Sequence, residues 1–251
     1  MSHQAGQAQD GMQDTAPERA HYGAWPTLGL SGLVLMGIFV IHLFTGELLY
    51  LFGAEVGQSR NAEMAVYWVA AFAGMGLLAR IISHHPEMGF RQYLGLHAPR
   101  PKALWAWLGL TGLFYAIFVL APALALVAQG ASWGPLAGTV FFVITAVTIA
   151  PLFEETLFRG FLLPGLARSR LGPAPAIMLV SALWVAVHFR LSADVVGEVY
   201  GLVILFGLGL LLGLARLREG SLVVPIAMHA LWNGTVLGVD SIIIARAGSA
   251  L

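Results

Sequence analysis

The sequence contains no cysteine and only one lysine, and few of its 251 residues carry a charge. Without cysteine there is no disulfide, no thiolate nucleophile and no cysteine-ligated metal. Charged residues make up 10% of the chain and hydrophobic residues 58%. In soluble domains about 25% of the residues are charged and roughly 45–50% are apolar. Thirteen basic residues balance thirteen acidic ones without forming a basic block, which argues against nucleic-acid binding. The composition therefore predicts an integral membrane protein with no nucleic-acid partner.

Long apolar runs follow a polar first segment. We expect residues 1–24 to form a flexible tail and residues 25–245 to form a single membrane domain. A transmembrane helix needs about 20 apolar residues. Candidate spans cover residues 25–52, 64–82, 104–127, 135–166, 175–189, 196–214 and 221–239. We therefore predict an all-α fold, a polytopic transmembrane bundle of about seven or eight helices.

The fourth of these runs, residues 135–166, is too long for one simple span. Pro151 lies inside it and Pro164 lies near its end. Because proline lacks the N–H that a helix interior needs, we expect either a kinked helix or a span followed by an interfacial turn.

Basic residues gather in the loops that follow the second, fourth and sixth spans. These residues are Arg91, Arg100, Lys102, Arg168, Arg170, Arg216 and Arg218. With seven spans the three loops lie on one face, and loops rich in lysine and arginine usually face the cytoplasm. The pattern predicts a cytoplasmic end that carries all three loops.

Three of the late apolar segments contain ionisable or amide side chains. APLFEETLFRGFL holds Glu154, Glu155 and Arg159, SALWVAVHFR holds His188, and SLVVPIAMHALWNG holds His229 and Asn233. An unpaired charge at the centre of a bilayer costs at least about 2.5 kcal/mol. Such groups are therefore the first candidates for function.

Helical spacing separates the two adjacent glutamates. Glu155 and Arg159 lie four residues apart, in the order that favours an ion pair on one helix face. Glu154 points about 100° away from Glu155. The spacing thus predicts a Glu155–Arg159 pair and leaves Glu154 as the free carboxylate. His229 and Asn233 are also four residues apart and share a face.

These groups have the chemistry of hydrolysis without a covalent intermediate. A carboxylate in a low-dielectric site can act as a general base, so Glu154 could take a proton from water while His188 holds that water or shares the proton. His229 and Asn233 could donate hydrogen bonds to a developing oxyanion. The sequence has no HExxH motif of zinc proteases and no GxGD signature of aspartyl intramembrane proteases.

Three short motifs resemble those of a known family. EETLFR is similar to EExxxR, WVAVH to FxxxH and HALWN to HxxxN, in the same order, in the CAAX-processing and bacteriocin-processing (CPBP) intramembrane endopeptidases. The resemblance covers roughly residues 85–238, and its motif-bearing core covers about residues 135–239. One departure is Trp184, which replaces the usual phenylalanine and could narrow the pocket.

The resemblance implies a glutamic protease that needs no cofactor or metal. By this match Glu154 activates water with the help of His188, and His229 and Asn233 form the oxyanion site. Glu155 and Arg159 would be the supporting pair. The implied partner is a peptide or protein substrate reached through the lipid bilayer.

Other interpretations remain open on the sequence alone. Glu154, His188 and His229 could instead be zinc ligands in a metal-dependent membrane hydrolase. The polar groups could also line the path of a proton-coupled transporter, although no internal repeat is evident, or the chain could be a non-catalytic relative. The substrate is also open among prenylated C-termini, leader peptides and tailed surface proteins. The Ala-, Gly- and Arg-rich composition favours a bacterial cytoplasmic membrane.

Overall fold

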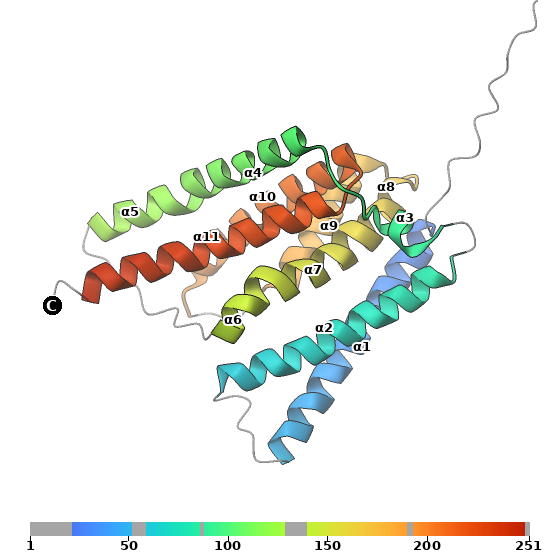
Figure 1. Cartoon of the computed structure of the whole chain (residues 1–251), viewed down its shortest axis with the longest axis horizontal. Coiled ribbons are helices and arrows are strands. Elements are labelled where there is room, and N and C mark those ends of the chain that lie inside the picture. Colours follow the sequence, from blue (N-terminus) through green and yellow to red (C-terminus); the bar gives the residue numbers. More distant parts are fainter. Residues whose placement is uncertain (1–21, 52–58, 86–87, 129–139, 190–192, 249–251) are drawn as a thin grey trace, which may run out of the picture.

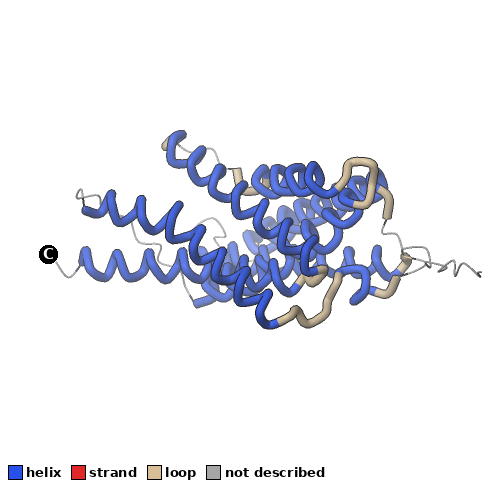
Figure 2. Tube along the Cα trace, turned by 90° about the horizontal axis from the view of Figure 1, so that it is seen from above, coloured by secondary structure: helices blue, strands red, loops and turns tan. Residues whose placement is uncertain are grey.

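The structure is a computed structural model that describes residues 22–51, 59–85, 88–128, 140–189 and 193–248. Within these ranges every regular element is a helix (Figure 2). The predicted all-α fold is therefore confirmed. Most of the predicted tail, residues 1–21, lies outside the described residues, but Tyr22 is placed, and its hydroxyl donates to the Ile81 carbonyl over 3.1 Å.

The first half of the chain forms a helical hairpin, a short helix and a long helix. Their bounds are α1 Ala24–Leu51, α2 Arg60–Ser83, α3 Phe90–Leu94, and α4 Pro101–Tyr115, which continues through the π-helical η1 Ala116–Leu120 into α5 Ala121–Ala128. The short α3 lies in a segment that we expected to be a loop.

The second half contains a long interrupted helix and three further helices. The interrupted helix consists of α6 Val140–Ile144, η2 Thr145–Ile149, α7 Ala150–Glu155, η3 Thr156–Leu162 and α8 Leu163–Ala167. The others are α9 Pro173–Ala186, α10 Val195–Glu219 and α11 Val223–Gly248.

Five helices in the described part of the chain are long and apolar enough to cross a membrane. Two shorter apolar helices, Pro173–Ala186 and Val223–Gly238, accompany them. Together they match the seven predicted apolar segments. Helix α9 ends three residues before the predicted boundary at residue 189. At about 1.5 Å per residue it is roughly 20 Å long, which is shorter than a hydrocarbon core of about 30 Å.

Each π-helical segment ends two residues before a proline. Segments η1, η2 and η3 precede Pro122, Pro151 and Pro164 in this way. A proline cannot donate a helical hydrogen bond, and its ring crowds the carbonyl four residues earlier. A wider π turn accommodates both effects while the helix continues. The run that we expected to kink or break is therefore one continuous helix, Val140–Ala167, and not a span followed by an interfacial turn.

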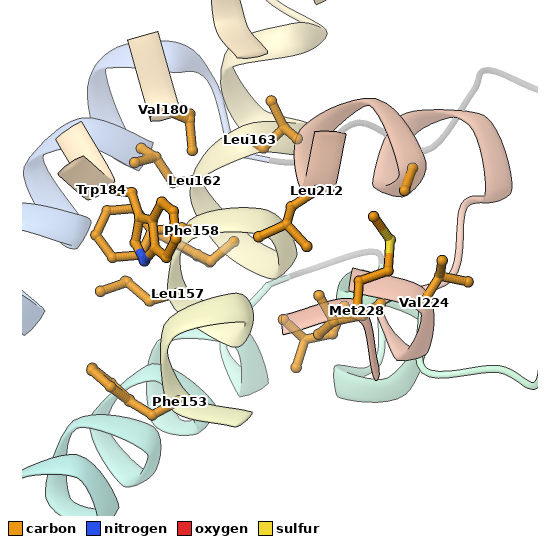
Figure 3. Close-up of a cluster of buried hydrophobic side chains, with 14 of the residues drawn as sticks. Phe153, Leu157, Phe158, Leu162, Leu163, Val180, Trp184, Leu212, Val224 and Met228 are labelled. Carbon is orange, nitrogen blue, oxygen red and sulfur yellow. The ribbon is translucent and has the colours of Figure 1, made fainter. Parts of the chain in front are cut away.

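This interrupted helix, α6–α8, occupies the centre of the molecule. It contacts α1, α2, α3, α9, α10 and α11, with the α1–α2 hairpin on one side and α4, α10 and α11 on the other (Figure 1). Residues 155–166 are buried on every side, which identifies an inner helix. Around it the core collects Phe158 and Leu162 from η3, Trp184 from α9, Leu212 from α10 and Met228 from α11 (Figure 3).

Large apolar side chains cover the outside of α1. The exposed ones include Trp25, Leu33, Met36, Phe39, Leu43 and Phe44. Water-soluble proteins rarely expose so continuous an apolar face. Lipid tails solvate such a surface, in keeping with the predicted membrane location.

The three basic loops meet at one end of the bundle, as the charge pattern predicts. The Leu222 amide donates to the Gly95 carbonyl over 3.0 Å, and the Ser221 hydroxyl donates to the His97 carbonyl over 2.6 Å. Gly95 has φ +67°, and a Cβ there would lie 2.3 Å from the Gly220 oxygen. Only glycine fits this crossing of the α3 loop over the α10–α11 turn.

Candidate active site

The polar residues of the three motifs gather beside the central helix. Glu154 and Glu155 end α7 and Arg159 lies in η3, whereas His229 and Asn233 come from α11. His188 lies in the turn directly after α9, not within a helix as predicted. Glu154 is about 20 Å along the central helix from its end at Ala167, well inside a helix that is long and apolar enough to cross a membrane.

One half of the site is a fully buried ion cluster around Glu155. Arg159 Nη1 lies 3.0 Å from Glu155 Oε1, as the spacing predicts, and neither side chain is exposed. His229 Nδ1 lies 2.9 Å from the same carboxylate oxygen. Buried charges are tolerated when they are paired and hydrogen-bonded. Glu155 therefore links the central helix to α11.

Gly209 of α10 makes room for this cluster. Its carbonyl accepts a hydrogen bond from Arg159 Nη2 over 3.3 Å. A Cβ at Gly209 would lie 3.3 Å from that nitrogen and 3.0 Å from the Ser181 Cβ of α9. Because glycine has no side chain, α10 can approach both the central helix and α9 at this point.

The other half of the site surrounds Glu154. Trp184 Nε1 donates to Glu154 Oε2 over 2.7 Å, and His188 Nε2 lies 3.7 Å from the same oxygen. The Glu154 side chain is 15% exposed and that of His188 is 31% exposed, in contrast to the inaccessible Glu155. Glu154 is therefore the carboxylate that an incoming molecule can reach.

His188 is oriented by a backbone carbonyl. Its Nδ1 lies 2.8 Å from the Trp184 oxygen. A carbonyl only accepts, so Nδ1 carries the hydrogen and Nε2 is the nitrogen that faces Glu154.

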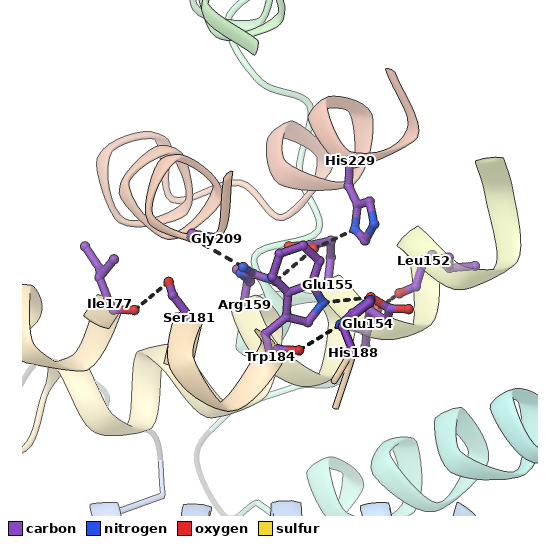
Figure 4. A network of polar contacts seen from close by, with 11 residues as sticks. Leu152, Glu154, Glu155, Arg159, Ile177, Ser181, Trp184, His188, Gly209 and His229 are labelled. Carbon is purple, nitrogen blue, oxygen red and sulfur yellow. Dashed lines mark hydrogen bonds and ion pairs between the residues drawn. The ribbon is translucent and has the colours of Figure 1, made fainter. Parts of the chain in front are cut away.

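Trp184 lies between the two halves (Figure 4). Its ring centroid is 4.9 Å from the His188 ring and 5.4 Å from the His229 ring. The Arg159 guanidinium lies over its face, 4.6 Å from the centroid, in a cation–π contact. Tryptophan at this position therefore supplies both the aromatic packing of a phenylalanine and an N–H donor that phenylalanine lacks.

Asn233 bonds to a carbonyl that Pro151 leaves without its helical partner. In the π-helical segment η2 a backbone N–H donates to the carbonyl five residues earlier. The Ala150 N–H, for example, donates to the Thr145 carbonyl. The Ala146 carbonyl would then need the N–H of residue 151, which is a proline. Asn233 Nδ2 donates to that carbonyl over 2.7 Å. His229 and Asn233 thus share a helix face, as predicted, but contact different parts of the central helix.

Tyr67 of α2 is a member of the site that the sequence interpretation missed. Its hydroxyl lies close enough to the Glu154 carboxylate to interact with it electrostatically. The first spans carry none of the three motifs, and the only signal would have been a tyrosine within an apolar run.

The described residues include no group of three His, Asp or Glu side chains placed to hold a metal ion. His229 contacts Glu155, whereas His188 is the histidine beside Glu154. The three residues of the alternative zinc site therefore do not converge on one point.

Comparisons with known proteins match part of the chain. A similar protein of Escherichia coli, described as an uncharacterized 24.3 kDa protein, is 33% identical over 136 residues, 50% of this chain. The match spans only 57% of that relative's length. No solved structure matches. The family model for Rce1-like type II CAAX prenyl endopeptidases matches residues 136–235, which contain all three motifs, and so confirms the resemblance to that family.

Proposed function

We propose that the protein is a glutamic-type intramembrane endopeptidase that hydrolyses a peptide bond near or within the membrane. The observation that carries the proposal is the contrast between two adjacent carboxylates. Glu155 is inaccessible and paired with a cation, whereas Glu154 is accessible and lies beside a histidine. The match to CAAX endopeptidases over residues 136–235 supports the same reaction class.

In the proposed reaction Glu154 is the general base. Trp184 donates a hydrogen bond to its carboxylate, and the Tyr67 hydroxyl lies beside it. The 3.7 Å between Glu154 Oε2 and His188 Nε2 is longer than a hydrogen bond, and one water molecule can contact both atoms. Glu154 takes a proton from this water as the oxygen attacks the scissile carbonyl carbon, and the proton then passes to the leaving amine.

The tetrahedral oxyanion would be stabilised from α11 by His229 and Asn233. His229 donates its Nδ1 hydrogen to Glu155, so Nε2 is the nitrogen left for substrate. Donation from Nε2 requires the imidazolium form of the ring, whose Nδ1 contacts the same Glu155 oxygen as Arg159. The Asn233 amide nitrogen has a second hydrogen beyond the one given to Ala146.

The proposed substrate is a peptide segment that enters from the lipid, because both carboxylates lie within a helix that is long and apolar enough to cross a membrane. Prenylated C-termini, leader peptides and tailed surface proteins all fit this description. The similar protein from a bacterium supports a bacterial cytoplasmic membrane as the location.

The test is a comparison of membrane peptides released in cells that express the native protein, Glu154→Gln or the control Glu63→Gln. Glu63 is an exposed acid at the start of α2. We expect cleavage products with the native protein and the control, and none with Glu154→Gln. Purified enzyme in vesicles should also keep cleaving its substrate in the presence of a strong chelator. Equal products from Glu154→Gln would contradict the proposal, and loss of cleavage in chelator would favour the metal-dependent alternative.

A further inference from the structure

A cavity lies at the basic end of the bundle, apart from the motif residues. Its volume is about 1100 Å³, and its walls come from α3 and the loop after it, the end of α8, the start of α9 and the end of α10. These elements lie together at one end of the molecule in Figure 1. None of the motif residues lines it, and Pro164 on its wall is about 15 Å along the central helix from Glu154.

The wall of this cavity is rich in positive charge. Its basic side chains are Arg91, His97, Arg168, Arg216 and Arg218. No acidic side chain is among the described residues that line it. The Glu219 carboxylate, next to Arg218 in sequence, is held by Arg100 Nη2 and Trp107 Nε1, each over 3.1 Å.

Arg216 places a buried charge on this wall. Its guanidinium donates to the carbonyls of Arg159 over 3.1 Å, Leu94 over 3.2 Å, and Gly220. All three acceptors are neutral, so these bonds hold the side chain without cancelling its charge. Arg216 has no carboxylate partner among the residues that the structure describes, and a buried cation in such surroundings favours an anion beside it.

The same cavity also has an apolar wall. Ile177, Leu214 and Leu217 line it together with the arginines. Arginine binds phosphate oxygens through paired N–H donors, and basic pockets between membrane helices bind anionic head groups. We propose that this cavity binds a phosphate-bearing anion, with the head group of an anionic phospholipid as the ligand that also uses the apolar wall. The proposal does not depend on the proteolytic activity.

The test is a binding titration with the full-length protein in detergent. Bound ligand is followed by native mass spectrometry during addition of short-chain phosphatidylglycerol, phosphatidylcholine of the same chain length, or inorganic phosphate. The variant Arg91→Gln/Arg218→Gln removes two exposed arginines of the wall and spares Arg216. The control Lys102→Gln/Arg170→Gln removes the same charge from the same end, outside the cavity.

We expect phosphatidylglycerol to bind the native protein and the control equally. Each arginine near a membrane surface contributes about fivefold in affinity, so the cavity variant should bind about 30-fold more weakly. If the cavity variant weakens the binding of inorganic phosphate but not that of phosphatidylglycerol, free phosphate is the ligand. Equal binding by the cavity variant, equal weakening in the control, or equal binding of phosphatidylcholine would overturn the proposal.

Discussion

Glu154 and Glu155 are neighbours in sequence, yet their side chains have different surroundings. The Glu155 side chain lies in a closed ion cluster, whereas the Glu154 side chain is partly exposed. Glu155 contacts Arg159 and His229, with no exposed side-chain surface. Glu154 contacts Trp184, Tyr67 and His188. A turn of about 100° per residue is enough to give two identical side chains different surroundings. The closed half can hold the helices together while the open half meets a substrate.

The largest effect should follow from breaking the buried ion pair between Glu155 and Arg159. Arg159→Met leaves the Glu155 charge buried without its guanidinium partner, and breaking such a pair costs about 3–5 kcal/mol. We expect a large drop in the melting temperature of the purified protein, with loss of cleavage. The double variant Glu155→Gln/Arg159→Met removes both charges and should regain part of the lost stability. A melting temperature for Arg159→Met equal to the native value would show that the pair does not stabilise the fold.

In the open half, His188→Ala should act on the reaction rather than on the fold. His188 lies outside α9 and its side chain is 31% exposed, so its removal creates no buried cavity. Loss of a proton-transfer partner typically costs about 10²–10⁴-fold in rate. We expect kcat to fall by at least about 100-fold at an unchanged melting temperature. His84→Ala, which alters an exposed histidine after α2, is the control and should cleave normally.

Trp184→Phe tests the residue that joins the two halves. It keeps an aromatic ring and removes the N–H that bonds to Glu154. Hydrogen bonds to charged groups contribute about 1.5–3 kcal/mol, so the cleavage rate should fall roughly tenfold or more while Arg159 keeps its aromatic neighbour. An unchanged rate would mean that the indole N–H does not orient Glu154.

The smallest effect should come from Tyr67→Phe. The variant removes a hydroxyl that lies beside Glu154, and the ring remains to fill its site in α2. A loss of about 1 kcal/mol, or roughly fivefold in kcat, is expected. Tyr50→Phe alters an exposed tyrosine of α1 and should leave the rate unchanged. A rate for Tyr67→Phe that matches this control would place the hydroxyl outside the catalytic arrangement.

Residue spacing in the sequence predicted the features that depend on residues close together in the chain. The Glu155–Arg159 pair follows from a separation of one helical turn, and the seven apolar helices follow from run length. The meeting of the three basic loops at one end follows from the number of spans.

The remainder depends on contacts between distant segments. Tyr67 reaches Glu154 from a helix without a motif, and single-residue polarity cannot identify such a partner. Asn233 bonds to Ala146 because Pro151 frees that carbonyl within a π turn. The prolines were visible in the sequence, but they left a kinked helix and a break equally open. The structure has one continuous helix with π turns before the prolines. The cavity at the basic end likewise needs loops that are far apart in sequence.

The most direct measurement compares Glu154→Gln with Glu155→Gln in the same vesicles, with cleavage rate and melting temperature recorded for each. We predict that Glu154→Gln keeps the native melting temperature and loses cleavage by about a thousandfold, the loss of a general base. Glu155→Gln should lower the melting temperature, because Arg159 then lacks its anion. Cleavage at the native rate by folded Glu154→Gln would contradict the assignment of Glu154 as the working carboxylate.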